Sequence, residues 1–106
     1  MPWAVTETFQ VSREDYRRVV DEVGDRDLPD GLYFHVAGRD GEGVRTMSVW
    51  ETEETFNAFV EQRGAPAAAR VLGADQAGPA STVAIDVEHF LMAHAMTPVS
   101  HRPAFY

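Results

Sequence analysis

The sequence predicts an α+β domain of the ferredoxin-like type, in which an antiparallel four-stranded sheet carries two helices on one face. The first observation is the order of the predicted elements, strand-helix-strand-strand-helix-strand, which matches the split βαβ arrangement. The second is the alternation of apolar and polar residues in three of the four strands. The third is the length of 106 residues, which suits one domain. We place this domain at residues 1–92 and a C-terminal tail at residues 93–106.

The first strand and helix are predicted from local patterns. β-Branched and aromatic residues dominate residues 3–10, which is typical of a strand. Ser12 can cap a helix near residues 12–24, and acidic residues fill the first turn, near the positive end of the helix. An apolar stripe at helical spacing follows: Tyr16, Val19, Val20 and Val23. Gly24 is the predicted end of this helix.

Two apolar runs, residues 32–37 and 44–50, flank a glycine-rich segment and predict a hairpin. We expect the more apolar face of each run to contact the helices: Leu32, Phe34, Val36, Met47 and Val49. The mixed face then lies on the open side of the sheet: Tyr33, His35, Ala37, Thr46, Ser48 and Trp50. With Trp3 as a further candidate, this open face is too apolar to stay in water, so we expect a second subunit to cover it.

The second half of the chain predicts one more helix and one more strand. Thr52 is the expected cap of a helix near residues 53–63, whose buried stripe contains Phe56, Phe59 and Val60. Pro66 is expected to interrupt this helix before one or two further turns. Residues 82–89 alternate cleanly, as in a half-buried strand.

Composition and charge exclude several classes of function. The chain contains no cysteine, which excludes disulfides, thiolate metal sites and cysteine nucleophiles. The net charge of −8 argues against binding to nucleic acid or to an anionic membrane surface. The N-terminus lacks the pattern of a signal peptide, and the longest uncharged stretch is far shorter than the ~20 residues of a membrane span. We therefore expect a cytoplasmic protein.

Residues 31–38, with the sequence GLYFHVAG, precede residues 49–52, with the sequence VWET, and a helix that contains Phe56 and Phe59. In this pattern the chain resembles small bacterial proteins of the dimeric α/β-barrel superfamily, the group of the antibiotic biosynthesis monooxygenases, and in particular uncharacterised actinobacterial members. The resemblance covers about residues 3–90. It implies a homodimer in which two open sheet faces close into a barrel.

This resemblance also implies a function. The superfamily includes cofactor-free oxygenases, polyketide cyclases, isomerases and heme-degrading enzymes, so we expect a small cofactor-independent enzyme for an aromatic or polyketide-like molecule of secondary metabolism. Heme degradation is not expected: Glu7 and its neighbours stand where that group has an asparagine, Phe59 where it has a tryptophan, and Ala69 where it has a histidine. The alternative is a non-catalytic dimeric module that holds a ligand or supports a partner protein.

His35 is the strongest candidate for chemistry, because an imidazole titrates near neutrality and can move a proton on an enolic or phenolic substrate. The alternative is a buried histidine with a structural hydrogen bond. In the catalytic hypothesis His35 lies away from the helices, Tyr33 or Ser48 fixes its ring, and Trp50 forms a wall for a flat substrate. Trp50 could instead seal the dimer. His89 is a further candidate for substrate contact.

No metal site is predicted. His89 and His94 are five residues apart, and His101 follows seven residues later. Two ligands on one face need a spacing of three or four residues on a helix, or of two on a strand. The histidines fit neither spacing, so the expected ligand is a small molecule alone.

Overall fold

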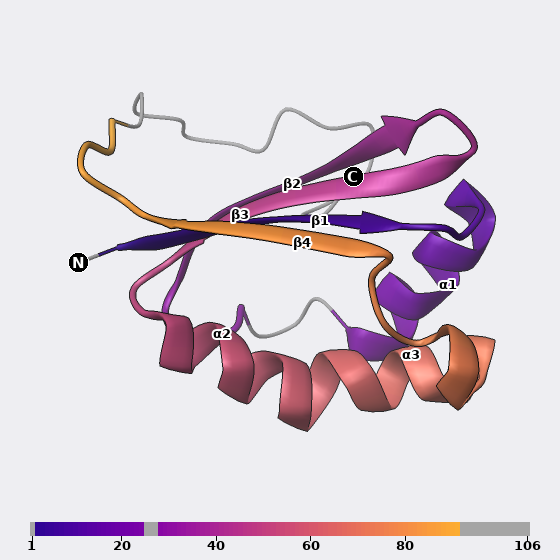
Figure 1. The fold of residues 1–106 in the computed structure, drawn as a ribbon. Coiled ribbons are helices and arrows are strands. Elements are labelled where there is room, and N and C mark those ends of the chain that lie inside the picture. The colour runs from indigo at the N-terminus through magenta and orange to yellow at the C-terminus, as the bar shows by residue number, and fades with distance from the viewer. Residues whose placement is uncertain (1, 25–27, 92–106) are drawn as a thin grey trace.

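The computed structural model describes residues 2–24 and 28–91. The elements are β1 (Trp3–Phe9), α1 (Arg13–Val23), β2 (Leu32–Asp40), β3 (Gly43–Trp50), α2 (Glu53–Phe59), η1 (Val60–Gly64), α3 (Ala65–Leu72), η2 (Ala74–Gln76) and β4 (Ser81–Asp86). The strands form one antiparallel sheet in the order β2-β3-β1-β4, and the helices lie together on one of its faces (Figure 1). The predicted ferredoxin-like α+β fold is confirmed.

The predicted tail of residues 93–106 lies outside the described residues, so its separation from the domain stays a prediction. Within the described part of the chain, no helix has the length and apolar character needed to cross a membrane.

The predicted helix caps are confirmed. The Ser12 hydroxyl accepts a hydrogen bond of 3.0 Å from the backbone N–H of Asp15. Gly24 ends α1 with a φ of 84°, a conformation that glycine adopts without a steric penalty. Thr52 and Thr55 exchange side-chain and backbone hydrogen bonds at the start of α2. These caps satisfy backbone donors that a helix leaves unpaired at its first turn.

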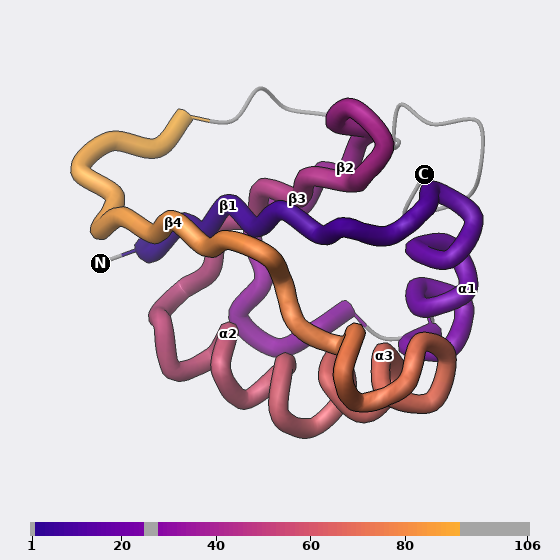
Figure 2. Tube along the Cα trace, turned by 45° about the vertical axis from the view of Figure 1, so that its right-hand side comes forward, coloured from indigo at the N-terminus to yellow at the C-terminus, as the bar shows by residue number. Residues whose placement is uncertain are grey.

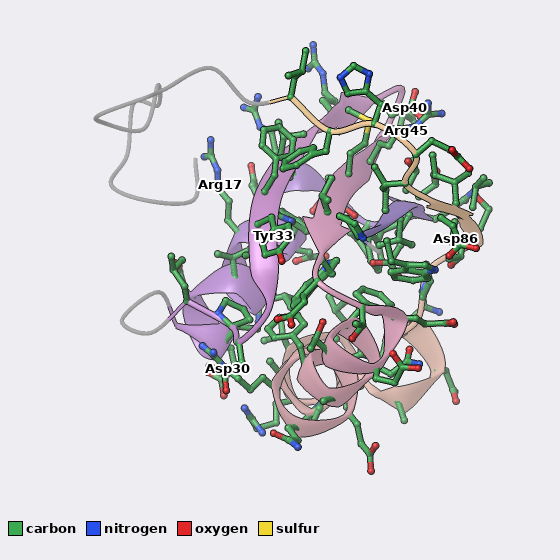
Figure 3. The ribbon with its side chains drawn as sticks, turned by 90° about the vertical axis from the view of Figure 1, so that its left-hand side faces the viewer. Arg17, Asp30, Tyr33, Asp40, Arg45 and Asp86 are labelled. Atoms are coloured by element: carbon green, nitrogen blue, oxygen red, sulfur yellow. The ribbon has the colours of Figure 1, made fainter. Side chains whose placement is uncertain are left out.

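The hairpin is tighter than the sequence suggests. β2 and β3 continue until Asp40 pairs with Gly43, so that the turn contains only two residues. Gly41 has a φ of 61° in this turn, the left-handed conformation that favours glycine in two-residue hairpins. Asp40 and Arg45 form an exposed ion pair of 2.8 Å beside the turn (Figure 3).

The second helix continues through Pro66, and the predicted interruption there is wrong. Figure 2 shows the coil running without a break from α2 into α3. Between them η1 is a π-helical segment, in which the Ala65 N–H reaches the Val60 carbonyl five residues back. Proline lacks an N–H and its ring collides with the carbonyl four residues earlier in a regular α-helix. The π turn before Pro66 is wider than an α-helical turn, which allows the helix to continue past the proline without a break.

From Phe34 onwards, the predicted faces of the hairpin are reversed, whereas Leu32 lies on the helix side as predicted. Thr46, Ser48 and Trp50 are buried towards the helices, whereas Met47 is 48% exposed on the other face. In β2 a bulge between Leu32 and Phe34 shifts the register by one residue, so that Leu32 and His35 both line the helix side. Both faces of β3 carry apolar side chains, so alternation alone could not identify the face that contacts the helices.

Trp3 and Trp50 are likewise on the helix side rather than on the open face. They pair across β1 and β3, and their rings lie 5.2 and 5.5 Å from the ring of Phe56 in α2. Trp50 is only 3% exposed, and Phe59 contacts its other side at a centroid distance of 5.5 Å. These aromatic contacts attach α2 to the sheet.

The open face of the sheet is nevertheless strongly apolar. Five large apolar side chains from β2, β3 and β4 are each between 40% and 64% exposed: Phe34, Val36, Met47, Val83 and Ile85. We call this set the open-face patch. Its residues differ from those expected on the open face. As expected, however, this face is an apolar surface in contact with water.

Candidate functional site

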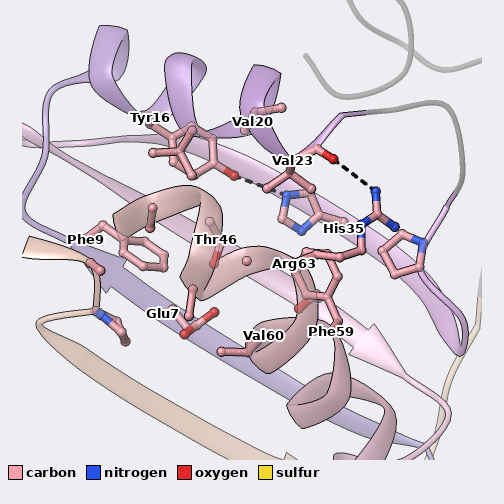
Figure 4. Close-up of a pocket in the computed structure, with 18 of the residues that line it drawn as sticks. Glu7, Phe9, Tyr16, Val20, Val23, His35, Thr46, Phe59, Val60 and Arg63 are labelled. Atoms are coloured by element: carbon pink, nitrogen blue, oxygen red, sulfur yellow. Dashed lines mark hydrogen bonds between the residues drawn. The ribbon is translucent and has the colours of Figure 1, made fainter. Parts of the chain in front are cut away.

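A cavity of about 310 Å³ lies between the sheet and the helices, within the size range of small-molecule sites (Figure 4). Strands β1 to β3 form its floor, while α1, α2, η1 and α3 form its walls. Its lining is mostly apolar and includes five aromatic rings: Phe9, Tyr16, Trp50, Phe56 and Phe59. Such a cavity suits a flat, apolar ligand.

Four polar side chains project into this cavity from three neighbouring strands. Glu7 of β1 pairs with Thr46 of β3, and His35 of β2 pairs with Ser48 of β3. Cross-strand partners point to the same face of a sheet, and so do residues two apart on one strand. The four side chains therefore form one polar patch on an otherwise apolar floor.

His35 is half-buried under α1. Its Nε2 atom lies 3.4 Å from the hydroxyl oxygen of Tyr16, a long hydrogen bond that restrains the ring (Figure 4). Burial lowers the pKa of the His35 imidazole below its ordinary value, because the charged form loses hydration. At neutral pH the ring is therefore neutral and can accept a proton.

Ser48 and Trp50 form a second fixed pair. The indole Nε1–H of Trp50 donates a hydrogen bond of 2.9 Å to the Ser48 hydroxyl oxygen. A hydroxyl that accepts one hydrogen bond can still donate its own proton. Ser48 is directly across the sheet from His35, so it can present that proton to the imidazole or to a ligand beside it.

Glu7 is a functional candidate that the sequence analysis missed. Burial raises the pKa of its carboxyl group, and within the described part of the chain no hydrogen bond or ion pair to this carboxyl is found. A signal was present: Trp3, Val5, Glu7 and Phe9 occupy one face of β1, and Glu7 is the charged residue among apolar neighbours. Glutamate is rarely buried unless it is paired, so a glutamate among the apolar residues of one strand face is an informative exception.

Arg63 of η1 lies where the cavity meets the end of α1. Its Nη2 group donates a hydrogen bond of 3.2 Å to the carbonyl of Val23 (Figure 4) and one of 3.4 Å to the carbonyl of Gly24. Its guanidinium also stacks 5.7 Å above the Phe59 ring centre. Arg63 therefore ties the π segment to α1 and adds one cation to the cavity lining.

The structure brings together three of the five predicted site residues, His35, Ser48 and Trp50. Tyr33 is 45% exposed and stacks on Phe90 at 6.2 Å, outside the cavity. His89 is exposed after the end of β4 and does not line the cavity either.

The expectation that His35 lies away from the helices is wrong, because Tyr16 of α1 contacts its ring. A catalytic role for His35 therefore belongs to the cavity and not to the open face of the sheet. The residue that holds the His35 ring is Tyr16 and not Tyr33.

Within residues 2–24 and 28–91, no group of three or more histidine, aspartate and glutamate side chains is arranged to hold a metal ion. His94 and His101 lie outside the described residues.

No family model matches this sequence, and no curated protein is similar to it. Its fold does occur among solved structures. One is assigned as an antibiotic biosynthesis monooxygenase from Chloroflexus aurantiacus J-10-fl, with a TM-score of 0.63, 13% identity and coverage of 91% of this chain and 99% of that one. Another is a mutant form of SnoaB, a cofactor-independent oxygenase from Streptomyces nogalater, with a TM-score of 0.57, 15% identity and coverage of 85% and 96%.

Of these two structural neighbours, one is described as an antibiotic biosynthesis monooxygenase and the other as a cofactor-independent oxygenase. The predicted resemblance to the antibiotic biosynthesis monooxygenases is confirmed for the fold, over most of the length of both chains. At this sequence identity the likeness establishes the shared fold, and the chemistry has to be argued from the cavity itself.

Proposed function

We propose that this protein is a small cofactor-independent enzyme that acts on an aromatic or polyketide-like molecule bound in the cavity between sheet and helices. The observation that supports this proposal best is the position of His35, a neutral imidazole on the polar floor of a cavity with aromatic walls. The cofactor-independent oxygenase among the structural neighbours supports an enzymatic role of the same general kind, in secondary metabolism.

The proposed first step is a proton transfer. His35 accepts a proton from a phenol, an enol or a carbon next to a carbonyl group, and the electron pair of the broken bond stays on the substrate. Tyr16 holds the imidazole in place, and the apolar walls keep water away from the charge that develops. Isomerisation, cyclisation and oxygenation can all begin with this step.

The second candidate is a module that binds a ligand without changing it. A module whose only role is to support a partner protein would be expected to pack His35 and Trp50 against their neighbours without a void. The cavity of about 310 Å³ beside both residues favours a ligand-binding role, catalytic or not, over that one.

The test uses 2-tetralone, a small bicyclic aromatic ketone, as the probe. The protein is incubated with this ketone in D₂O, and NMR follows the replacement of the protons next to the carbonyl by deuterium. We expect exchange well above the rate in buffer with an equal concentration of free imidazole. Binding without faster exchange would support the non-catalytic module, and absence of binding would contradict both candidates.

We also propose that the protein is a homodimer formed through the open-face patch. Obligate dimers bury more than about 2,000 Å², largely apolar, and this face offers apolar side chains from three strands. In the proposed dimer the two sheets stack face to face, which leaves each cavity on the outer, helix-covered side of its own sheet.

Substitution of Met47 by aspartate is expected to convert this dimer into a monomer, because it places a charge in the centre of the apolar interface. Sedimentation velocity at micromolar concentration measures the change. Gln76→Asp is the matched control, since it adds an exposed charge on η2, within the helix layer. A wild-type protein that sediments as a stable monomer would contradict the dimer.

A further inference from the structure

We propose that Glu7 is a second catalytic residue of the cavity, which in its protonated form donates a hydrogen bond to a carbonyl oxygen of the substrate while His35 accepts the proton. This inference rests on the proposed function and makes it more specific. It names the substrate class as planar, enolisable ketones with the carbonyl group attached to or fused with an aromatic ring system.

The first argument is the placement of the two groups. Glu7 and His35 both line the cavity, from β1 and β2, with β3 between them. They lie two strands apart, and their partners on β3, Thr46 and Ser48, are two residues apart along that strand. The Cα atoms of Glu7 and His35 are therefore separated by roughly 12 Å. Figure 4 shows the two side chains facing the same cavity from different positions. They leave room for a ring system between them and can contact it at two separate atoms.

The second argument is the chemical state of Glu7. None of the three ion pairs within the described residues includes this carboxyl group. Arg63 is the cation of the cavity lining, and it is hydrogen-bonded to the end of α1. Burial raises the pKa of this carboxyl group, because the ionised form loses hydration beside apolar side chains, so the neutral acid persists to a higher pH than in an exposed glutamate. A neutral carboxylic acid has an O–H group that can donate to a ligand.

The third argument is the reaction that this pair permits. His35 takes a proton from the carbon next to the carbonyl, and the C–H electron pair forms a C=C bond. The carbonyl π electrons move onto oxygen, where the O–H of Glu7 stabilises the developing negative charge. Return of the proton from His35 to a different carbon gives an isomerised product. Atoms and electrons balance in this sequence without an oxidant or a reductant.

The test compares two substitutions of Glu7 with two probes. Glu7→Gln keeps a hydrogen-bond donor of similar size, whereas Glu7→Leu removes it. The probes are 2-tetralone, which has the carbonyl oxygen, and naphthalene, which lacks it. Glu51→Gln is the matched control, because Glu51 is exposed and outside the cavity lining. Circular dichroism checks that each variant is folded.

We expect Glu7→Leu to weaken 2-tetralone binding about tenfold, the usual value of one buried hydrogen bond, with naphthalene binding unchanged. The exchange rate should fall about 10²–10³-fold, as for the loss of an oxyanion donor. Glu7→Gln should bind 2-tetralone nearly as well as the wild type, and Glu51→Gln should match it throughout.

Equal losses in Glu7→Gln and Glu7→Leu would overturn the proposal, since they would indicate an ionised carboxylate. Unchanged binding of 2-tetralone by Glu7→Leu would also overturn it. These outcomes are separable from a failure of the proposed function. If the wild type binds both probes without exchanging protons, the enzyme hypothesis and the catalytic role of Glu7 fail together. If the wild type exchanges protons and the Glu7 substitutions leave the exchange rate unchanged, only the proposal for Glu7 fails.

Discussion

His35→Ala is expected to slow the protein-dependent exchange of 2-tetralone by about 10²–10⁴-fold, which corresponds to roughly 3–5 kcal/mol of transition-state stabilisation. The physical reason is the loss of the group that accepts the proton. In the wild type the exchange rate should fall at acidic pH with a midpoint below the ordinary imidazole value of 6.5, because burial lowers the pKa of His35 and protonation removes the base. NMR exchange rates measured against pH test both the magnitude and the profile.

His89→Ala is the control for this experiment. His89 is exposed and outside the cavity lining, so its removal should leave the exchange rate unchanged. If a folded His35→Ala protein keeps full activity, His35 is not part of the mechanism. If His89→Ala abolishes exchange instead, the assignment of the cavity as the active site is wrong.

Trp50→Ala is expected to lower the free energy of unfolding by about 3–5 kcal/mol, the usual cost of removing a buried tryptophan. Trp50 is 3% exposed, contacts Phe56 and Phe59, and donates a hydrogen bond to Ser48. A small domain has only about 5–15 kcal/mol of stability, so this single change approaches the limit of folding. Urea denaturation followed by circular dichroism measures the loss.

Two further variants locate the cause of that loss. Trp50→Phe retains a ring against α2 but no N–H donor, so it should be destabilised less than Trp50→Ala. Tyr33→Ala removes an aromatic side chain that is 45% exposed and should cost less than about 1 kcal/mol. Equal stability losses for Trp50→Ala and Tyr33→Ala would contradict the description of Trp50 as the contact that attaches α2 to the sheet.

The element order and the helix ends were predictable because they depend on local interactions. Ser12 and Thr52 cap their helices through bonds to residues three positions away, and Gly24 ends α1 through its own backbone freedom. The course of the chain at Pro66 was not predictable from local pattern, because the tertiary contacts differ on the two sides of the proline: α2 packs against β3, and α3 packs against α1.

The sequence by itself determined the two-layer fold and the presence of an apolar open face, since the alternating strands contain more apolar side chains than one layer of helices can cover. Only the tertiary structure decided which face is which. The one-residue bulge in β2 placed His35 beneath α1. The orientation of β3 placed Trp50 on the helix side of the sheet, against Phe59. The alternation of β1 already marks Glu7 as unusual, but only the fold brings Glu7 and Tyr16 into one cavity with His35, because these residues meet across strands and layers.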